Sequence, residues 1–267
     1  MGTAQTKTIS TQSERRLYLL RALLRESQEL SGLSIPLPED ERSQRDLLRT
    51  LFNRRPPRPV SVDFLAVQDA YLQEELREMG ITDIDDLMPE APYTYLWRGD
   101  ITTLRCDAIV NAANRELLGC FIPYHKCIDN AIHTYAGVQL RLECARIMRQ
   151  QGHPEPSGRA KITRAYNLPC RHIIHTVGPI VRGGVTPADD RVLGESYRSC
   201  LETAAANGAT SIAFCCLSTG EFQFPRGRAA KIAVVTVNRY RQETGSRMKV
   251  LYNVFTEEDE EVYRDLL

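Results

Sequence analysis

The chain has 267 residues, of which 42% are hydrophobic, so it can bury the core of one sizeable domain, with or without an extension. Lysine plus arginine and aspartate plus glutamate both number 34, and this zero net charge argues against nucleic acid or an anionic membrane surface as the main partner. No uninterrupted apolar run is long enough to cross a bilayer.

The N-terminal residues and the cysteines indicate a compartment. The first ten residues lack the apolar segment of a secretory signal, so we expect the eight cysteines to be thiols in a reducing cytoplasm. Residues 1–6 match a myristoylation pattern. Such a short pattern occurs often by chance and no second membrane signal accompanies it, so we expect no lipid anchor.

Residues 1–91 are predicted to form a helical extension. Leucines recur at helical spacing over 14–30 and 39–52, with prolines between the two segments, and a third helix is expected from about Phe64 to Gly80. Residues 54–59, RRPPRP, are interpreted as a basic, solvent-exposed linker rather than a phosphate site. No residue pattern with evident chemistry precedes about Pro92.

From Tyr93 onward, short apolar runs alternate with longer helical patterns, which predicts an α/β domain over 92–267 with a largely buried sheet. The expected strands are 95–98, 108–111, 162–166, 172–177, 211–217 and 249–254. The expected helices are 128–148, 193–206 and 226–242. Ligands bind beyond the carboxyl ends of the strands in such sheets, so the loops that follow strands are the candidate site.

Three of these loops carry distinctive residues. Gly99 permits a tight turn, and Asp100 offers a carboxylate that can accept from an exocyclic amine. The segment 111–114, Asn-Ala-Ala-Asn, combines room for close approach with amides that suit sugar hydroxyls. The segment 218–222 precedes a helix, so its backbone amides could cradle a phosphate or diphosphate, although the lysine of a P-loop is absent. Each loop could also be an ordinary turn.

A cluster of candidate metal ligands follows the second of these loops. Cys120, His125 and Cys127 form a C-x4-H-x-C pattern between an expected strand and an expected helix. Thiolates and imidazoles are the ligands that zinc prefers. Three protein ligands leave a fourth position open, as in catalytic sites, whereas structural zinc usually has four. The pattern therefore favours an open, functional zinc site over a structural one.

A fourth protein ligand would close this site. His133 is expected to contact Asp129, one helical turn earlier, while Cys106 remains open as a fourth ligand. His172 and His175 are expected to pack in or beside a strand with satisfied hydrogen bonds, and His153 to lie in a loop. The other cysteines are expected to be small buried apolar residues: Cys144, Cys170, Cys200, Cys215 and Cys216.

The three loops and their order resemble a macrodomain, the ADP-ribose-binding module. The likeness rests on residues 99–102, 107–114 and 218–220 with Phe222, and it spans Tyr93 to the C-terminus. It implies a three-layer α/β/α fold with a mixed central sheet, with adenine near Asp100 and Ile101, the distal ribose near Asn114 and the diphosphate near 218–222. The implied ligand-binding residues are Gly99, Asp100, Ile101, Asn111, Ala112, Ala113, Asn114, Asn130, Ser218, Thr219, Gly220, Glu221 and Phe222.

Residues 118–133 replace the glycine-rich loop of many macrodomains and resemble the zinc-containing subgroup, whose members also have an N-terminal helical extension. Those proteins are hydrolases that remove single ADP-ribose units from proteins, and some are encoded beside a sirtuin-type transferase and a lipoylated carrier protein. The resemblance implies that Cys120, His125 and Cys127 bind Zn²⁺. It also implies that Asn114 and Asp129 are catalytic, with Asn130 near the distal ribose.

The reaction implied is zinc-dependent hydrolysis of the bond between the distal ribose C1 atom and a protein side chain, which we expect to be an acidic one. Zinc would activate water or polarise the sugar or leaving group, Asn114 would position the sugar, and Asp129 would orient a ligand, hydroxyl or water. Two alternatives remain: a non-catalytic ADP-ribose reader, or a hydrolase of O-acetyl-ADP-ribose or a terminal phosphate. We expect a monomer with no nucleic-acid or membrane partner.

Overall fold

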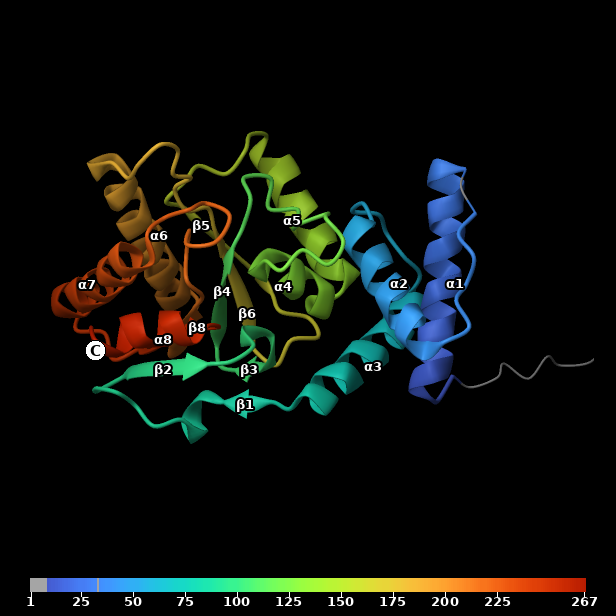
Figure 1. The fold of residues 1–267 in the computed structure, drawn as a ribbon, viewed down its shortest axis with the longest axis horizontal. Helices are drawn as coiled ribbons and strands as arrows, with labels where there is room; N and C mark the ends of the chain where they lie inside the picture. Colours follow the sequence, from blue (N-terminus) through green and yellow to red (C-terminus); the bar gives the residue numbers. More distant parts are fainter. Residues whose placement is uncertain (1–8, 33) are drawn as a thin grey trace, which may run out of the picture.

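The computed structural model describes residues 9–32 and 34–267, so the myristoylation pattern at 1–6 lies outside the described residues. A six-stranded sheet forms the centre of this described part (Figure 1). Its order is β2-β8-β7-β4-β6-β5, and all neighbours are parallel except β5 and β6. The strands are β2 (Thr94–Arg98), β4 (Ala108–Ala112), β5 (Ala160–Arg164), β6 (His172–Thr176), β7 (Ser211–Phe214) and β8 (Lys249–Val254).

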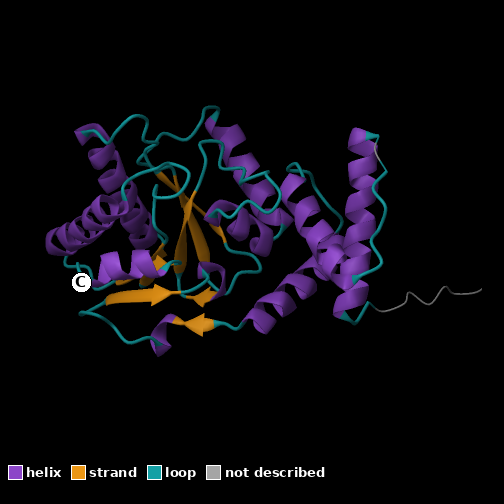
Figure 2. Cartoon of the chain, in the orientation of Figure 1, coloured by secondary structure: helices purple, strands orange, loops and turns teal. Residues whose placement is uncertain are grey.

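Helices cover both faces of this sheet. On one face lie α6 (Pro187–Ala206), α7 (Arg226–Thr244) and α8 (Glu257–Arg264), and on the other lie α4 (Ile128–Ala136) and α5 (Val138–Gln151) (Figures 1 and 2). Strand side chains such as those of Ile109, Ile173 and Leu251 are fully buried between the layers. The expected three-layer α/β/α fold with a mixed sheet is confirmed.

The N-terminal extension consists of α1 (Gln12–Ser31), α2 (Glu41–Arg54) and α3 (Val62–Met79). Each begins at a polar residue whose side chain accepts from the first turn, namely Thr11, Asp40 and Ser61. Their apolar faces form a cluster of their own, which Val138 at the start of α5 joins. The extension therefore packs beside the α4 and α5 layer (Figure 1). Among the described helices, none is long and apolar enough to span a membrane.

Several elements differ from the sequence expectations. A small parallel pair, β1 (Thr82–Asp83) with β3 (Leu104–Arg105), was not expected, nor were α8 and the short 3₁₀ helices η1 (Ile84–Asp86) and η2 (Ile101–Thr103). Helix α6 begins at Pro187 rather than 193, because Thr186 and Asp189 form a capping box. Strand β7 ends at Phe214 rather than 217, where the chain turns towards the candidate site.

The helix expected over 128–148 is two helices, α4 and α5, separated at Gly137. Gly137 has φ +96°, and a Cβ atom there would lie 2.6 Å from Nε2 of Gln68 in α3. Gln68 Oε1 in turn accepts from the backbone N–H of Val138 at 3.0 Å. The extension thus supplies the missing cap at the start of α5, a contact that helical periodicity alone does not predict.

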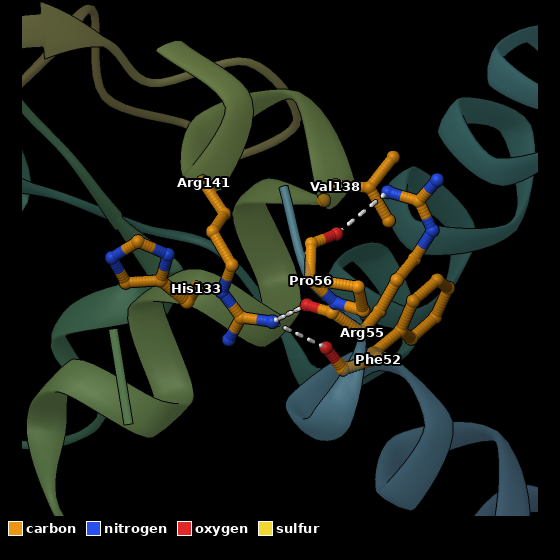
Figure 3. A pocket seen from close by; sticks show the side chains of 7 residues that line it. Phe52, Arg55, Pro56, His133, Val138 and Arg141 are labelled. Atoms are coloured by element: carbon orange, nitrogen blue, oxygen red, sulfur yellow. Dashed lines mark hydrogen bonds between the residues drawn. The ribbon is translucent and has the colours of Figure 1, made fainter. Parts of the chain in front are cut away.

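The expectation of a fully solvent-exposed linker over 54–59 is wrong for Arg55. Its side chain is buried and donates to Glu26 and to the carbonyl of Arg58, both at 2.8 Å. Arg141 of α5 reaches the same region and donates to the carbonyls of Phe52 (3.0 Å) and Arg55 (2.5 Å) (Figure 3). The buried guanidinium group of Arg141 binds the end of α2 to the α/β domain, while that of Arg55 binds it to Glu26 of α1.

Candidate functional site

The candidate site lies at the carboxyl edge of the sheet. Strands β2, β4 and β7 all run parallel to their common neighbours, so the loops that follow them emerge at the same edge. These loops carry Asp100, Asn114 and Ser218. The helix α4, with Asp129, begins after the same β4 loop.

The loop after β2 is tightly built. A Cβ atom on Gly99 would lie 2.2 Å from the Trp97 ring, so a larger residue there would force that ring to move. Asp100 caps η2 through Oδ1, which accepts from the backbone N–H (2.9 Å) and the hydroxyl (2.6 Å) of Thr102. Oδ2 has no hydrogen-bond partner among the described residues and remains available for a ligand. Ile101 as a whole is 1% exposed, so its side chain packs in the core rather than facing a ligand.

The segment 111–114 divides between the core and the site. Asn111 is fully buried, and its Nδ2 donates to Oδ1 of Asp129 at 2.8 Å. Nδ2 is therefore used inside the protein, whereas Oδ1 is buried without a hydrogen-bond partner among the described residues, so the expected contact of Asn111 with a sugar stays a prediction. Ala112 is half-buried, while Ala113 is buried and donates from its backbone to Thr176 O at 2.9 Å. Asn114 is half-buried and reaches the edge of the site.

Asn114 and Asp129 lie together. Asn114 Nδ2 donates to Gly119 O at 2.9 Å and lies 3.5 Å from Oδ2 of Asp129. Oδ1 of Asn114 is buried and has no hydrogen-bond partner among the described residues. Burial raises the pKa of Asp129 to about 6, although the hydrogen bond from Asn111 and the charge of Arg141 lower it in part. This pair offers a polar amide and a carboxylate to one reacting group.

Buried hydrogen bonds connect Asp129 to Asn111, His175 and Thr163. The carboxylate can only accept, which fixes Nδ2 of Asn111 towards Asp129 and, at 3.1 Å, towards Nδ1 of His175. Nε2 of His175 then carries the proton and donates to the Thr163 hydroxyl at 2.9 Å. The expected core role of His175 is thus confirmed. His133 Nε2 lies 3.5 Å from Oδ1 of Asp129, as expected for this pair.

The loop after β7 has an unusual backbone. Ser218 has φ +64°, and its buried Oγ has no partner among the described residues. A Cβ atom on Gly178 would lie 2.0 Å from that Oγ, so a larger residue there would force the Ser218 hydroxyl to move. Thr219 Oγ1 donates to Cys216 O at 3.1 Å, Gly220 is exposed, and Phe222 O accepts from Val181 N at 2.9 Å. Hydrogen bonds to Cys216 and Val181 therefore hold the conformation of the 218–222 loop.

The Cys120, His125 and Cys127 side chains converge. Their ligand atoms all lie within 4.8 Å of one another, and all three residues are half-buried. Tetrahedral zinc bonds place neighbouring ligand atoms roughly 3.5 to 3.8 Å apart, so small side-chain movements would satisfy them. Nδ1 of His125 is buried without a hydrogen-bond partner among the described residues. The donor set, spacing and unpartnered nitrogen fit a zinc ion.

Neither residue considered as a fourth ligand belongs to this group. Cys106 is buried elsewhere, with Sγ 3.2 Å from Ala108 O. His133 groups instead with Cys144 and His175, whose ligand atoms also lie within 4.8 Å of one another, all buried. In that second group both nitrogens of His175 are already engaged with Asn111 and Thr163, whereas neither nitrogen of His133 has a hydrogen-bond partner among the described residues.

The extension braces the segment that carries the candidate metal ligands. Asn53 of α2 accepts from the backbone N–H of Tyr124 (3.3 Å) and donates to Thr134 in α4 (2.8 Å). Arg49 lies over the Tyr124 ring at 5.7 Å and donates to Asn130 at 3.3 Å. Asn130 is itself fully buried and donates to Ile122 O at 2.9 Å, so its side chain holds the loop rather than facing a sugar.

The comparisons with known proteins agree with this geometry. A family model of the Macro domain matches residues 110–233. The chain is also 55% identical over 261 residues to a protein of Treponema medium named "Protein-ADP-ribose hydrolase", covering 96% of this chain and 99% of the relative. The chain belongs to the macrodomain family. A Staphylococcus aureus protein of the same name is 48% identical over 261 residues, covering 97% of each chain.

Solved macrodomain structures share the fold. The Oceanobacillus iheyensis macrodomain with MES bound has a TM-score of 0.58 and 36% identity, covering 64% of this chain and 87% of its own. The Trypanosoma brucei macrodomain in complex with ADP-ribose has a TM-score of 0.63 and 31% identity, covering 82% of this chain and 94% of its own. The Treponema and Staphylococcus relatives cover this macrodomain together with its helical extension.

Several residues around this macrodomain site were not singled out from the sequence. Arg49 and Asn53 lie on a helix whose pattern indicates only an amphipathic surface, so no sequence signal connects them to the segment with the candidate metal ligands. Arg141 carried one signal, since it shares the buried face of α5 with Leu140 and Cys144. A charged residue on an apolar helix face requires buried partners.

Proposed function

We propose that this macrodomain hydrolyses the bond between the distal ribose of ADP-ribose and a protein side chain, releasing mono-ADP-ribose. The observation that carries the proposal is the pairing of Asn114 with Asp129, where a buried amide oxygen without a partner adjoins a carboxylate. Buried polar atoms are normally paired, so this oxygen is suited to a ligand hydroxyl or amine. The names of two relatives that align over the full extension and macrodomain support the same activity.

The other loops at the carboxyl edge of the sheet have groups that can bind the adenine and the diphosphate of ADP-ribose. Oδ2 of Asp100 can accept from the exocyclic amine of adenine, while the loop 218–222 and the Ser218 hydroxyl can donate to the diphosphate. These contacts lie in loops after β2 and β7, on either side of β4 in chain order. They would fix the nucleotide so that its distal ribose lies beside Asn114 and Asp129.

In the reaction, Asn114 would hold a sugar hydroxyl and Asp129 would orient the attacking water or a ribose hydroxyl. Asp129 is held for this purpose by Asn111, which keeps the carboxylate in one orientation. Cys120, His125 and Cys127 would hold a zinc ion beside this pair. When bound, zinc supplies Lewis acidity towards the distal ribose.

The finer points of substrate are also proposals. The bond cleaved would join the ribose to an acidic side chain, and a lipoylated carrier protein modified by a sirtuin-type transferase is the first substrate to test. The protein would act as a monomer. A non-catalytic reader would bind the same nucleotide through the same loops, and a hydrolase of O-acetyl-ADP-ribose or a terminal phosphate would share them too.

Turnover separates these functions. The protein is incubated with a mono-ADP-ribosylated substrate, O-acetyl-ADP-ribose and ADP-ribose 1″-phosphate, and release of ADP-ribose is followed by mass spectrometry. We expect fastest release from protein, and about a 100-fold or greater loss for Asp129→Asn and Asn114→Ala with ADP-ribose binding retained. Binding without turnover of any substrate would instead identify a reader.

The metal is tested separately by elemental analysis. We expect about one zinc per wild-type chain and a loss of both metal and turnover in His125→Ala and Cys127→Ala. A variant that loses the metal but cleaves the modified protein at the normal rate would show that zinc has no part in the reaction.

A further inference from the structure

Glu221 contacts the candidate metal cluster from the opposite loop. It lies after β7, and its Oε1 is 3.3 Å from Nε2 of His125. The Glu221 side chain is 73% exposed and the His125 side chain 27% exposed. Among the described residues, this is the contact that joins the 218–222 loop to a candidate metal ligand.

The contact with Glu221 indicates which ring nitrogen of His125 has the lone pair that a metal ion needs. An ionised carboxylate only accepts hydrogen bonds, so Nε2, which lies 3.3 Å from Oε1 of Glu221, is the nitrogen suited to carry the proton of a neutral His125. Nδ1 then has the lone pair. Nδ1 is the buried nitrogen without a hydrogen-bond partner, in the residue that groups with Cys120 and Cys127.

The position of Glu221 disfavours a direct role for its side chain in nucleotide binding. A carboxylate beside a diphosphate raises the energy of both anions, whereas beside an imidazole N–H it forms a charge-assisted hydrogen bond. The backbone of residue 221 can still face the diphosphate. The Glu221 carboxylate is better suited to interact with the imidazole of His125.

We propose that Glu221 is a positioning residue that fixes the tautomer and orientation of His125, so that Nδ1 faces the metal. The inference rests on the zinc site of the proposed function and adds to it a carboxylate outside the ligand set. A histidine ligand whose other N–H donates to a carboxylate is held in one orientation and is a stronger base. Loss of such a carboxylate typically lowers metal affinity about 10- to 100-fold.

Glu221→Ala is the direct test, with zinc affinity measured by competition against a chromogenic chelator. We expect affinity about 10- to 100-fold below wild type, and a smaller loss for Glu221→Gln, whose amide oxygen still accepts from Nε2. In the cobalt-substituted protein, the visible absorption bands should shift in Glu221→Ala, because His125 is no longer held. Since Glu221 is exposed, urea unfolding of the metal-free variant should match that of wild type.

Glu116→Ala is the matched control. Glu116 is exposed in the segment that follows β4, and its removal takes away the same charge without touching a candidate ligand. Equal metal affinities in wild type and Glu221→Ala would overturn the inference. An equal loss in Glu221→Ala and Glu116→Ala would also overturn it, because the effect would then come from charge alone.

The same measurements separate this inference from the proposed function. Wild-type protein that holds no zinc would overturn both the metal site and the role of Glu221. Wild-type protein that holds zinc and cleaves its substrate, with Glu221→Ala unchanged in affinity and cobalt spectrum, would overturn the role of Glu221 alone.

Discussion

At the residue scale, three titratable groups beneath the site are held away from their usual pKa values. Burial lowers the pKa of His175 to about 3 and that of His133 well below its ordinary value. Burial also raises the pKa of Asp129 to about 6. Both histidines are therefore neutral in the folded protein near pH 7, and the hydrogen bonds of His175 to Asn111 and Thr163 depend on that state.

The pKa of His175 predicts a loss of stability in mild acid. Between pH 6.5 and about 3 the unfolded chain binds a proton at residue 175 that the folded chain does not, so the free energy of unfolding falls as pH falls. For this group alone the fall is about 1.4 kcal/mol between pH 7.5 and 5.5. His133 acts in the same direction, whereas Asp129, with a raised pKa, acts in the opposite one.

Comparison of wild type with His175→Asn isolates this contribution. Urea unfolding at pH 7.5 and 5.5 should find the variant less stable at both values, with a gap from wild type that narrows by about 1.4 kcal/mol at the lower pH. The groups around residue 175, including His133, Cys144 and Asp129, are the same in both proteins and largely cancel. A gap that stays constant would mean that His175 is not kept neutral by the fold.

At the element scale, α2 serves as a brace for the segment between β4 and α4. Asn53 is 1% exposed and connects α2 to Tyr124 and Thr134. Tyr124 has φ +57°, an uncommon conformation for a bulky residue that surrounding contacts must hold. The candidate ligand His125 follows directly, so the position of α2 affects where the imidazole lies.

Asn53→Ala should therefore weaken both the fold and the candidate metal segment. The variant leaves the backbone N–H of Tyr124 and the Thr134 hydroxyl without their partner, which costs about 1 to 3 kcal/mol of unfolding free energy. Bound zinc should also dissociate faster into excess chelator. Asn207→Ala is the control, because Asn207 makes one exposed bond to Thr203 O at the end of α6. Identical behaviour of the two variants would argue against the brace.

Comparison of the predicted with the observed elements shows which parts of the fold and the candidate site the sequence predicts. The sheet strands and the three site loops follow from apolar runs and from residues such as Gly99 and Asn114, because both signals are local. The break at Gly137 depends on Gln68, and the burial of Asn111 depends on Asp129 and His175, contacts between residues far apart in the chain. Periodicity carries no information about such partners, so the sequence does not predict the contacts where distant segments meet.

At the scale of the whole molecule, the extension and the macrodomain are interlocked rather than joined by a linker. Val138 enters the apolar cluster of α1, α2 and α3. Arg141 donates to carbonyls at the end of α2 and, at 2.7 Å, to Leu118 O beside the candidate metal segment. Separating the two parts would leave these buried groups without partners. The extension therefore stabilises the same segment that carries the candidate ligands.

This interlocking predicts a single cooperative unfolding transition for the whole chain. The sole tryptophan, Trp97, lies in β2 of the macrodomain, so its fluorescence reports the sheet, while far-ultraviolet circular dichroism reports all the helices, including α1 to α3. In urea the two signals should change with the same midpoint and slope. Arg141→Ala removes the central contact and should lower that midpoint in both signals. Loss of helical signal at lower urea than the Trp97 change in wild type would instead mean that the extension unfolds independently, and that the candidate metal segment lacks support from it.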